Sequence, residues 1–212
     1  MQFVQPSGEF LDFGWPKIGT QTELEILKKL FKHKPLSDQL VVNRGKSVLV
    51  HRIAHYFIKC FNFTPYFCSD RDGVKKSDDY KEYCFDDSAI PSVIAAINST
   101  TFYFYWQVFY DAFKAGKHCV EHFPFNSIGD DTTQKMLKKL SDKLMKDLKS
   151  HSNRLEATYR TSGKVEYDQF FPRKSKPIMD EIDSALAKHY GLSEPELDFL
   201  INYDVKFRVS NV

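Results

Sequence analysis

A run of aromatic residues between positions 102 and 113 limits the folds open to this chain more than any other feature. Its rings recur at steps of three and four residues, at Phe102, Tyr105, Trp106, Phe109, Tyr110 and Phe113. Such spacing predicts a helix that is buried on most of its sides. A chain of 212 residues is long enough to build the core that covers such a helix.

Capping signals and apolar periodicity predict further helices. Thr20 with Glu23, and Ser193 with Glu196, have the spacing of a capping box, in which two side chains satisfy backbone groups at a helix start. Gly191 lies where the C-terminal cap of a helix is expected. The predicted helices cover about 21–31, 89–97, 132–159, 178–186 and a short segment ending at Ile201.

Extended segments are predicted mainly in the first half of the chain. Tyr80–Phe85 alternates like a strand, and 46–61 reads as a strand that passes into a helix. Residues 118–125 are expected to be extended, because Pro124 restrains the residue before it. The predicted class is α+β, with a mixed α/β region over 1–128 and a helical region over 129–212 that can pack as one domain.

The charges are nearly balanced, with a net charge of +2, so composition alone does not indicate a nucleic-acid partner. Their distribution is less even. Residues 131–176 hold twelve Lys and Arg against six Asp and Glu, and residues 177–212 hold three against seven. The basic stretch, and above all the lysines between Lys135 and Lys149, could contact phosphates or form an ordinary solvated face.

The four cysteines are far apart and form no Cys-x-x-Cys pair, which favours reduced thiols and a cytoplasmic location. The first residues lack the basic and apolar regions of a signal peptide, and the longest apolar run, Phe102–Phe109, is too short to span a bilayer. We therefore expect neither export nor a membrane partner.

No complete catalytic motif occurs in the sequence. Methyl transfer to an exocyclic amine needs a cofactor-binding turn and a polar-Pro-Pro-aromatic loop, and the nearest fragment, 64–67, has a single proline. His118 and His122 match the His-x-x-Glu-His spacing of some zinc proteases, which requires a helix. In an extended backbone these residues lie roughly 13 Å apart, so neither a metal site nor a catalytic residue is predicted.

Two long stretches carry a resemblance to a known family. Residues 95–106 read AAINSTTFYFYW and are followed by HFPF at 122–125, while 176–204 contain KPIMDEID, YGL and ELDFLINYD. These stretches resemble the C-terminal target-recognition region of adenine-N6 DNA methyltransferases of the restriction-modification type. Pro65, Tyr66, Phe67, Ser77 and Tyr80 also fall where that family places a Pro-Tyr-Phe turn and a Ser-x-x-Tyr.

The resemblance implies a region that selects a site on double-stranded DNA while a separate part extrudes the adenine. The catalytic half of the family, with its S-adenosylmethionine turn and Asn-Pro-Pro-Tyr loop, would precede residue 1. The chain is therefore expected to bind no cofactor and to work with an N-terminal methyltransferase domain or subunit.

Reading bases requires Arg, Lys, Asn or Gln side chains presented from loops on a rigid frame. The candidate DNA-binding residues are Arg44, Lys46, Arg71, Lys75, Lys76, Lys114, Lys117 and His118. One alternative is a protein-protein docking module that binds a methylase or restriction partner without touching DNA. Another is a metal-dependent hydrolase built on His118 and His122, which would contain bound zinc.

Overall fold

Two consecutive helices, α2 (Ile90–Asn98) and α3 (Thr100–Phe109), form the centre of the structure. The structure is a computed structural model that describes residues 4, 8–10, 13–42, 45–126 and 128–209. Ser99 separates the two helices because its backbone is extended and its side chain accepts a hydrogen bond from Phe102 N at 3.1 Å, which caps α3. Asn98 closes α2 and bonds both backbone groups of Cys60.

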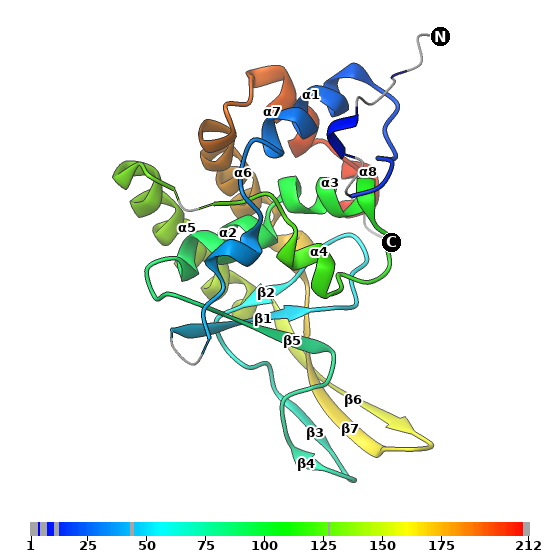
Figure 1. Ribbon diagram of the computed structural model, residues 1–212. Helices are drawn as coiled ribbons and strands as arrows, with labels where there is room; N and C mark the ends of the chain where they lie inside the picture. Colours follow the sequence, from blue (N-terminus) through cyan, green and yellow to red (C-terminus); the bar gives the residue numbers. More distant parts are fainter. Residues whose placement is uncertain (1–3, 5–7, 11–12, 43–44, 127, 210–212) are drawn as a thin grey trace.

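Helix α3 is buried on nearly all sides, as its aromatic pattern predicts. Tyr103 and Trp106 are covered almost completely, and Phe102, Phe104 and Tyr105 are equally buried. The surrounding helices are α1 (Gln21–Leu30), α4 (Lys117–Glu121), α5 (Asp131–Ser150), α6 (Lys176–Tyr190), α7 (Glu194–Ile201) and α8 (Val205–Arg208), with short 3-10 turns at Gly8–Phe10, Leu36–Gln39 and Pro172–Ser175. Figure 1 shows these helices gathered on one side of the molecule.

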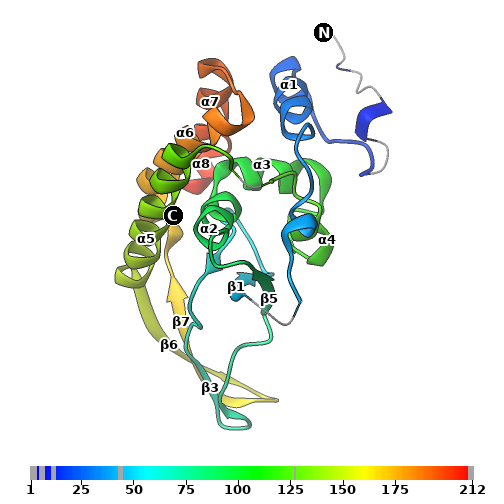
Figure 2. The same cartoon turned by 60° about the vertical axis from the view of Figure 1, so that its left-hand side comes forward.

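A three-stranded antiparallel sheet lies under α2. Its order is β2 (Cys60–Phe61), β1 (Lys46–His51) and β5 (Tyr80–Phe85), with Val48 opposite Tyr83. Figure 2 shows α2 between this sheet and the pair α5 and α6. One hydrophobic core takes side chains from both the first and the last part of the chain.

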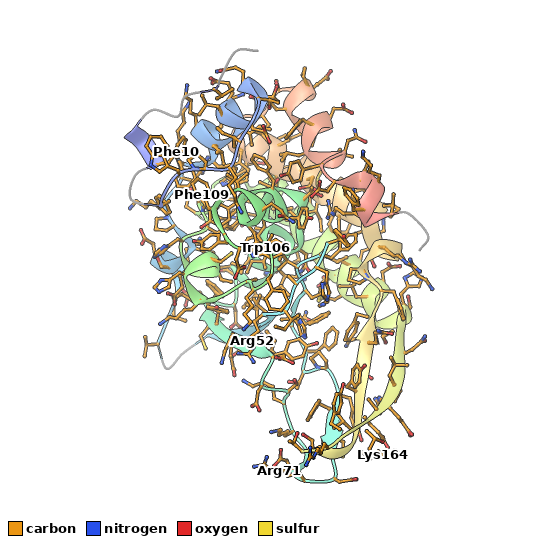
Figure 3. All side chains as sticks on the ribbon, turned by 90° about the vertical axis from the view of Figure 1, so that its right-hand side faces the viewer. Phe10, Arg52, Arg71, Trp106, Phe109 and Lys164 are labelled. Carbon is orange, nitrogen blue, oxygen red and sulfur yellow. The ribbon has the colours of Figure 1, made fainter. Side chains whose placement is uncertain are left out.

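A second sheet extends away from the helices, and we call it the β arm. Its order is β4 (Gly73–Val74), β3 (Phe67–Ser69), β7 (Gly163–Phe170) and β6 (Ser152–Tyr159), all antiparallel. The arm thus joins two hairpins that are distant in the sequence. Figure 3 shows Arg71 and Lys164 at its outer end, far from Phe10 and Phe109 at the opposite end of the molecule.

One carboxylate fastens the two hairpins together at the tip of the β arm. Asp70 Oδ2 accepts a hydrogen bond from Lys164 N at 2.7 Å, and Asp70 N donates to Lys164 O at 3.0 Å. Gly163 turns there with a φ of 70°, and a Cβ on it would lie 2.7 Å from Asp70 Oδ2. The close approach therefore requires glycine for both its conformation and its size.

Most local predictions are confirmed. The fold is α+β, and α1, α2, α6 and α7 lie where the sequence places them. Tyr80–Phe85 is a strand, both capping boxes form, and Gly191 caps α6 in the left-handed conformation. Among the described residues, no helix combines the length and the apolar character needed to cross a bilayer.

Four local predictions are wrong. The aromatic pattern predicts a buried helix that continues to Phe113, but α3 ends at Phe109 and Phe113 is exposed. The helix predicted over 132–159 ends at Ser150, and its last part is strand β6, so the region 129–212 contributes a hairpin as well as helices. The segment after β1 forms no helix before β2. Residues 117–121 are helical rather than extended, because Pro124 restricts only the residue before it and Gly116 begins the turn.

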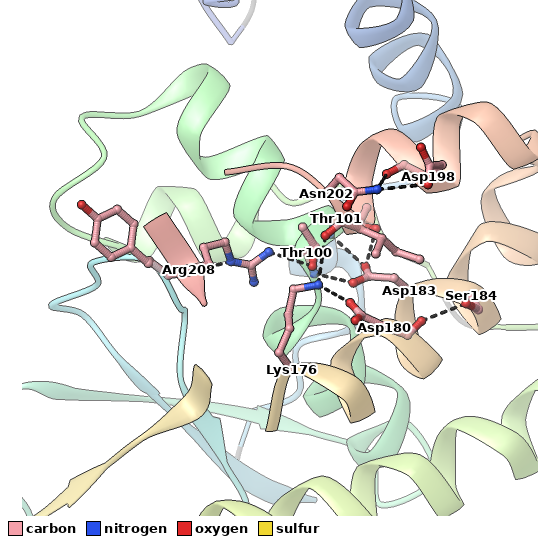
Figure 4. Close-up of polar contacts among 11 residues, drawn as sticks. Thr100, Thr101, Lys176, Asp180, Asp183, Ser184, Asp198, Asn202 and Arg208 are labelled. Carbon is pink, nitrogen blue, oxygen red and sulfur yellow. Dashed lines mark hydrogen bonds and ion pairs between the residues drawn. The ribbon is translucent and has the colours of Figure 1, made fainter. Parts of the chain in front are cut away.

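A buried polar network joins α6 and α8 to the N-terminus of α3. The carboxylate of Asp183 on α6 accepts hydrogen bonds from the backbone N–H groups of Thr100 and Thr101, at 3.0 and 3.1 Å, at the N-terminus of α3. Arg208 Nη1 donates to Thr100 Oγ1 at 3.0 Å, and Tyr103 Oη donates to Asp204 at 3.0 Å. Figure 4 shows the contacts of Asp183 and Arg208 with the start of α3, and beside them the bond from Lys176 to Asp180.

Burial raises the pKa of Asp183, while the donors of Thr100 and Thr101 and the charge of Arg208 oppose the shift. A carboxylate in this position complements the partial positive charge at the start of α3 and satisfies donors that would otherwise be unpaired in the core. Helix α6 is therefore fixed to α3 by direction-dependent bonds as well as by apolar contact.

We predict that Asp183→Ala lowers the free energy of unfolding by about 3–5 kcal/mol, because it leaves the backbone donors of Thr100 and Thr101 without their acceptor and removes the negative charge that favours the buried Arg208 cation. The exposed Asp198→Ala serves as the control and should change stability by less than about 0.5 kcal/mol. Chemical denaturation of the two variants measures both effects. Equal stability of Asp183→Ala and the unaltered chain would contradict this role.

Candidate functional site

A groove of about 890 Å³ lies between the β arm and the helical body. We call it the arm groove. Its walls come from strand β7, from the loop between β1 and β2, from residues 65–67 and from α8. Ten of its lining side chains are aromatic, namely Tyr56, Phe57, Tyr66, Phe67, Tyr80, Tyr159, Tyr167, Phe170, Phe171 and Phe207.

Both carboxylates that line the arm groove are neutralised by cations. Asp79 Oδ1 lies 3.1 Å from Arg52 Nη2. Asp168 accepts hydrogen bonds from Arg154 Nε at 2.8 Å and from Tyr66 N at 3.0 Å. The Arg154 guanidinium also lies over the Tyr66 ring, 3.6 Å from its centroid, so the same contact fixes one aromatic wall.

The remaining cations of the groove have no such partner. Within the described part of the chain, Lys59, Arg173 and His55 make no hydrogen bond or ion pair through their side chains. Burial lowers the pKa of Lys59 to about 8, and the charge of Asp79 partly opposes that shift. Near neutral pH the groove therefore presents Lys59 and Arg173 as uncompensated positive charges.

His51 adds a neutral polar group to the groove floor. Its Nδ1 lies 2.6 Å from Ile53 O and donates to it, because a carbonyl oxygen can only accept. Its ring meets Tyr80 edge-on at a centroid distance of 4.8 Å. Burial, followed by the nearby charge of Lys59, lowers the pKa of His51 to about 4, so the imidazole is uncharged at pH 7.

An aromatic pair forms one rim of the arm groove. The rings of Tyr56 and Phe207 lie 6.1 Å apart with only 11° between their planes, and 46% and 55% of these residues is exposed. Buried Arg208 holds the segments that carry these two rings. It directly follows Phe207, its Nε donates to Tyr56 O at 3.0 Å, and its guanidinium lies over the Phe57 ring at 4.5 Å. The polar network around Asp183 thus extends to the groove.

The candidate cations predicted from the sequence lie outside this groove. On the β arm, Arg71 lies 3.6 Å from Asp72, while Lys75 pairs with Asp72 and Asp78 and Lys76 pairs with Glu82. The structure brings these three together near the β3–β4 turn. Whether they contact DNA stays a prediction.

The other predicted cations fall into separate places. Lys46 pairs with Asp87 at 2.8 Å at the start of β1. Lys114 lies between α3 and α4, where its backbone pairs with that of Ile53. Lys117 and His118 begin α4, and Lys117 pairs with Glu121. Arg44 lies outside the described residues.

The histidine motif is closer to a metal-binding arrangement than the sequence suggests. Because α4 is helical, His118 and His122 have ring centroids only 5.4 Å apart. Yet the described residues contain no group of three or more His, Cys, Asp and Glu side chains that could hold a metal ion. Two imidazoles do not complete the four ligands typical of a structural zinc site.

Sequence reasoning missed most of the arm groove. A partial signal exists at Lys59, which stands between the fully apolar positions Ile58 and Cys60. The third part of the family resemblance also falls there, since Pro65, Tyr66, Phe67, Ser77 and Tyr80 all line the groove. Comparisons of the chain with models of protein families, with curated proteins and with solved structures find no match.

We predict that the Lys59 amine titrates with a midpoint near pH 8, well below the ordinary lysine pKa of about 10.4. Asp79→Asn should lower the Lys59 midpoint further, because the Asp79 charge favours the protonated amine. Nuclear magnetic resonance of labelled lysine side chains over pH 6 to 11 measures both. A Lys59 midpoint at the ordinary lysine value would show that the amine is fully solvated.

Proposed function

We propose that this chain binds DNA in the arm groove and serves as the target-recognition part of an adenine-specific DNA methyltransferase of the restriction-modification type. The proposal is supported by the composition of this groove. Ten aromatic side chains line it together with cations that make no ion pair, and its two carboxylates are neutralised by arginines. Nucleic acids combine phosphates with flat apolar bases, which is the complementary chemistry.

The shape of the β arm supports contact with a duplex. β-Strands of DNA-binding proteins can enter a groove of the duplex, and the outer end of the arm presents two hairpin turns joined by Asp70. Arg71 at the tip is exposed, and its contact with Asp72 is a weak surface pair. Replacing the Asp72 carboxylate by a phosphate or a base edge as the partner of Arg71 costs little free energy, so the tip can approach the bases.

The family resemblance supplies the biological setting of this proposal. Its residues fall on the α2–α3 core, on the α6–α8 segment and on the groove wall at 65–67. No residue of this chain is assigned to methyl transfer. S-adenosylmethionine and the extruded adenine would be bound by an N-terminal methyltransferase domain or subunit, in the cytoplasm.

We predict that Lys59→Met combined with Arg173→Ala weakens binding of a DNA duplex about tenfold or more at 0.1 M salt, since each charge-assisted hydrogen bond is worth roughly 1.5–3 kcal/mol. The salt dependence should also fall, by about 0.9 in the logarithmic slope for each phosphate contact that is removed. Fluorescence anisotropy titrations with a labelled duplex at several salt concentrations measure both quantities.

The matched control is Lys32→Ala with Lys34→Ala, which removes the same charge from exposed positions after α1, outside the groove. It should leave affinity and salt slope within about twofold of the unaltered chain. Equal losses in the two double variants would mean that only net charge matters. Absence of DNA binding, together with copurification of a methylase, would instead favour a docking module.

A further inference from the structure

The rim formed by Tyr56 and Phe207 is unusual in its exposure. The large aromatic residues exposed among the described part of the chain are Trp15, Tyr56, Phe113, Tyr159 and Phe207, and three of these five line the arm groove. Tyr56 and Phe207 come from distant segments, yet their planes lie within 11° of each other. A flat ligand that stacks on one of these rings therefore lies nearly parallel to the plane of the other ring.

We propose that Tyr56 and Phe207 bind an unpaired nucleobase of DNA by stacking, while Lys59 and Arg173 hold the adjoining backbone phosphates. This inference rests on the proposed function and adds to it the kind of DNA that the groove prefers. Within an intact duplex each base is covered on both faces by its neighbours, so a protein ring can stack only on a base that has left the stack.

The rim is prepared for such a ligand before binding. Arg208 is only 2% exposed, and it holds the Tyr56 carbonyl at 3.0 Å and the Thr100 hydroxyl at 3.0 Å at the same time. Because Phe207 directly precedes Arg208, the same anchor fixes the backbone of both rings. Fixed rings lose little conformational freedom on binding, which favours affinity.

The charge around the rim matches a nucleotide rather than an uncharged ring compound. Lys206 Nζ lies 5.9 Å from the centroid of the Phe207 ring, and its side chain makes no ion pair with the described residues. Lys59 and Arg173 are likewise unpaired on the groove wall. An unpaired base carries a phosphate on each side, so cations that flank an aromatic platform suit it.

The test compares two duplexes of the same sequence, one fully paired and one with a single bulged 2-aminopurine. We expect the unaltered chain to bind the bulged duplex about five- to tenfold more tightly and to quench its fluorescence, since stacking of a base on an aromatic side chain is worth roughly 1–3 kcal/mol. Tyr56→Ala and Phe207→Ala should bring the affinity ratio close to one and abolish the quenching. Tyr56→Trp should retain both.

Trp15→Ala is the control, because it removes a still more exposed ring that does not line the groove; it should keep the preference. Equal affinity for the two duplexes without quenching, with binding still dependent on Lys59 and Arg173, would overturn this inference and leave the proposed function standing. Binding of neither duplex would overturn both. An equal loss of preference in Trp15→Ala and Tyr56→Ala would also overturn the assignment to this rim.

Discussion

The structure depends on one interaction above all: the buried carboxylate of Asp183 accepts hydrogen bonds from the first backbone N–H groups of α3. It fixes α6 against the most deeply buried helix and places Thr100 where Arg208 can bond it. Arg208 in turn holds the loop that carries Tyr56. A contact in the centre of the core is thus linked to a surface rim through a continuous series of hydrogen bonds.

Local signals explain why much of the helical body can be predicted from the sequence. The capping box at Thr20, the aromatic spacing of α3 and the alternation of β5 each depend on neighbours within a few residues. The β arm has no such signal. Leu155 continues the leucine spacing of α5, whereas in the structure β6 pairs with β7 as a hairpin and β7 also pairs with the distant Phe67–Ser69 segment.

The candidate site is harder to predict than the fold, for a physical reason. The predicted cations were chosen for lying in polar loops, and in those loops Arg71, Lys75 and Lys76 find carboxylates within a few residues. Lys59 instead lies between Ile58 and Cys60, Arg173 follows Phe171 and Pro172, and no Asp or Glu stands within four residues of either cation. Charge that lacks a local partner is the better indicator of a site that awaits a charged ligand.

The most direct measurement is a crystal structure of the chain bound to a short DNA duplex. We expect DNA in the arm groove, with backbone phosphates hydrogen-bonded to Lys59 Nζ and to the Arg173 guanidinium and with the outer end of the β arm in the major groove. DNA bound along the lysines of α5, with the arm groove unoccupied, would contradict this expectation.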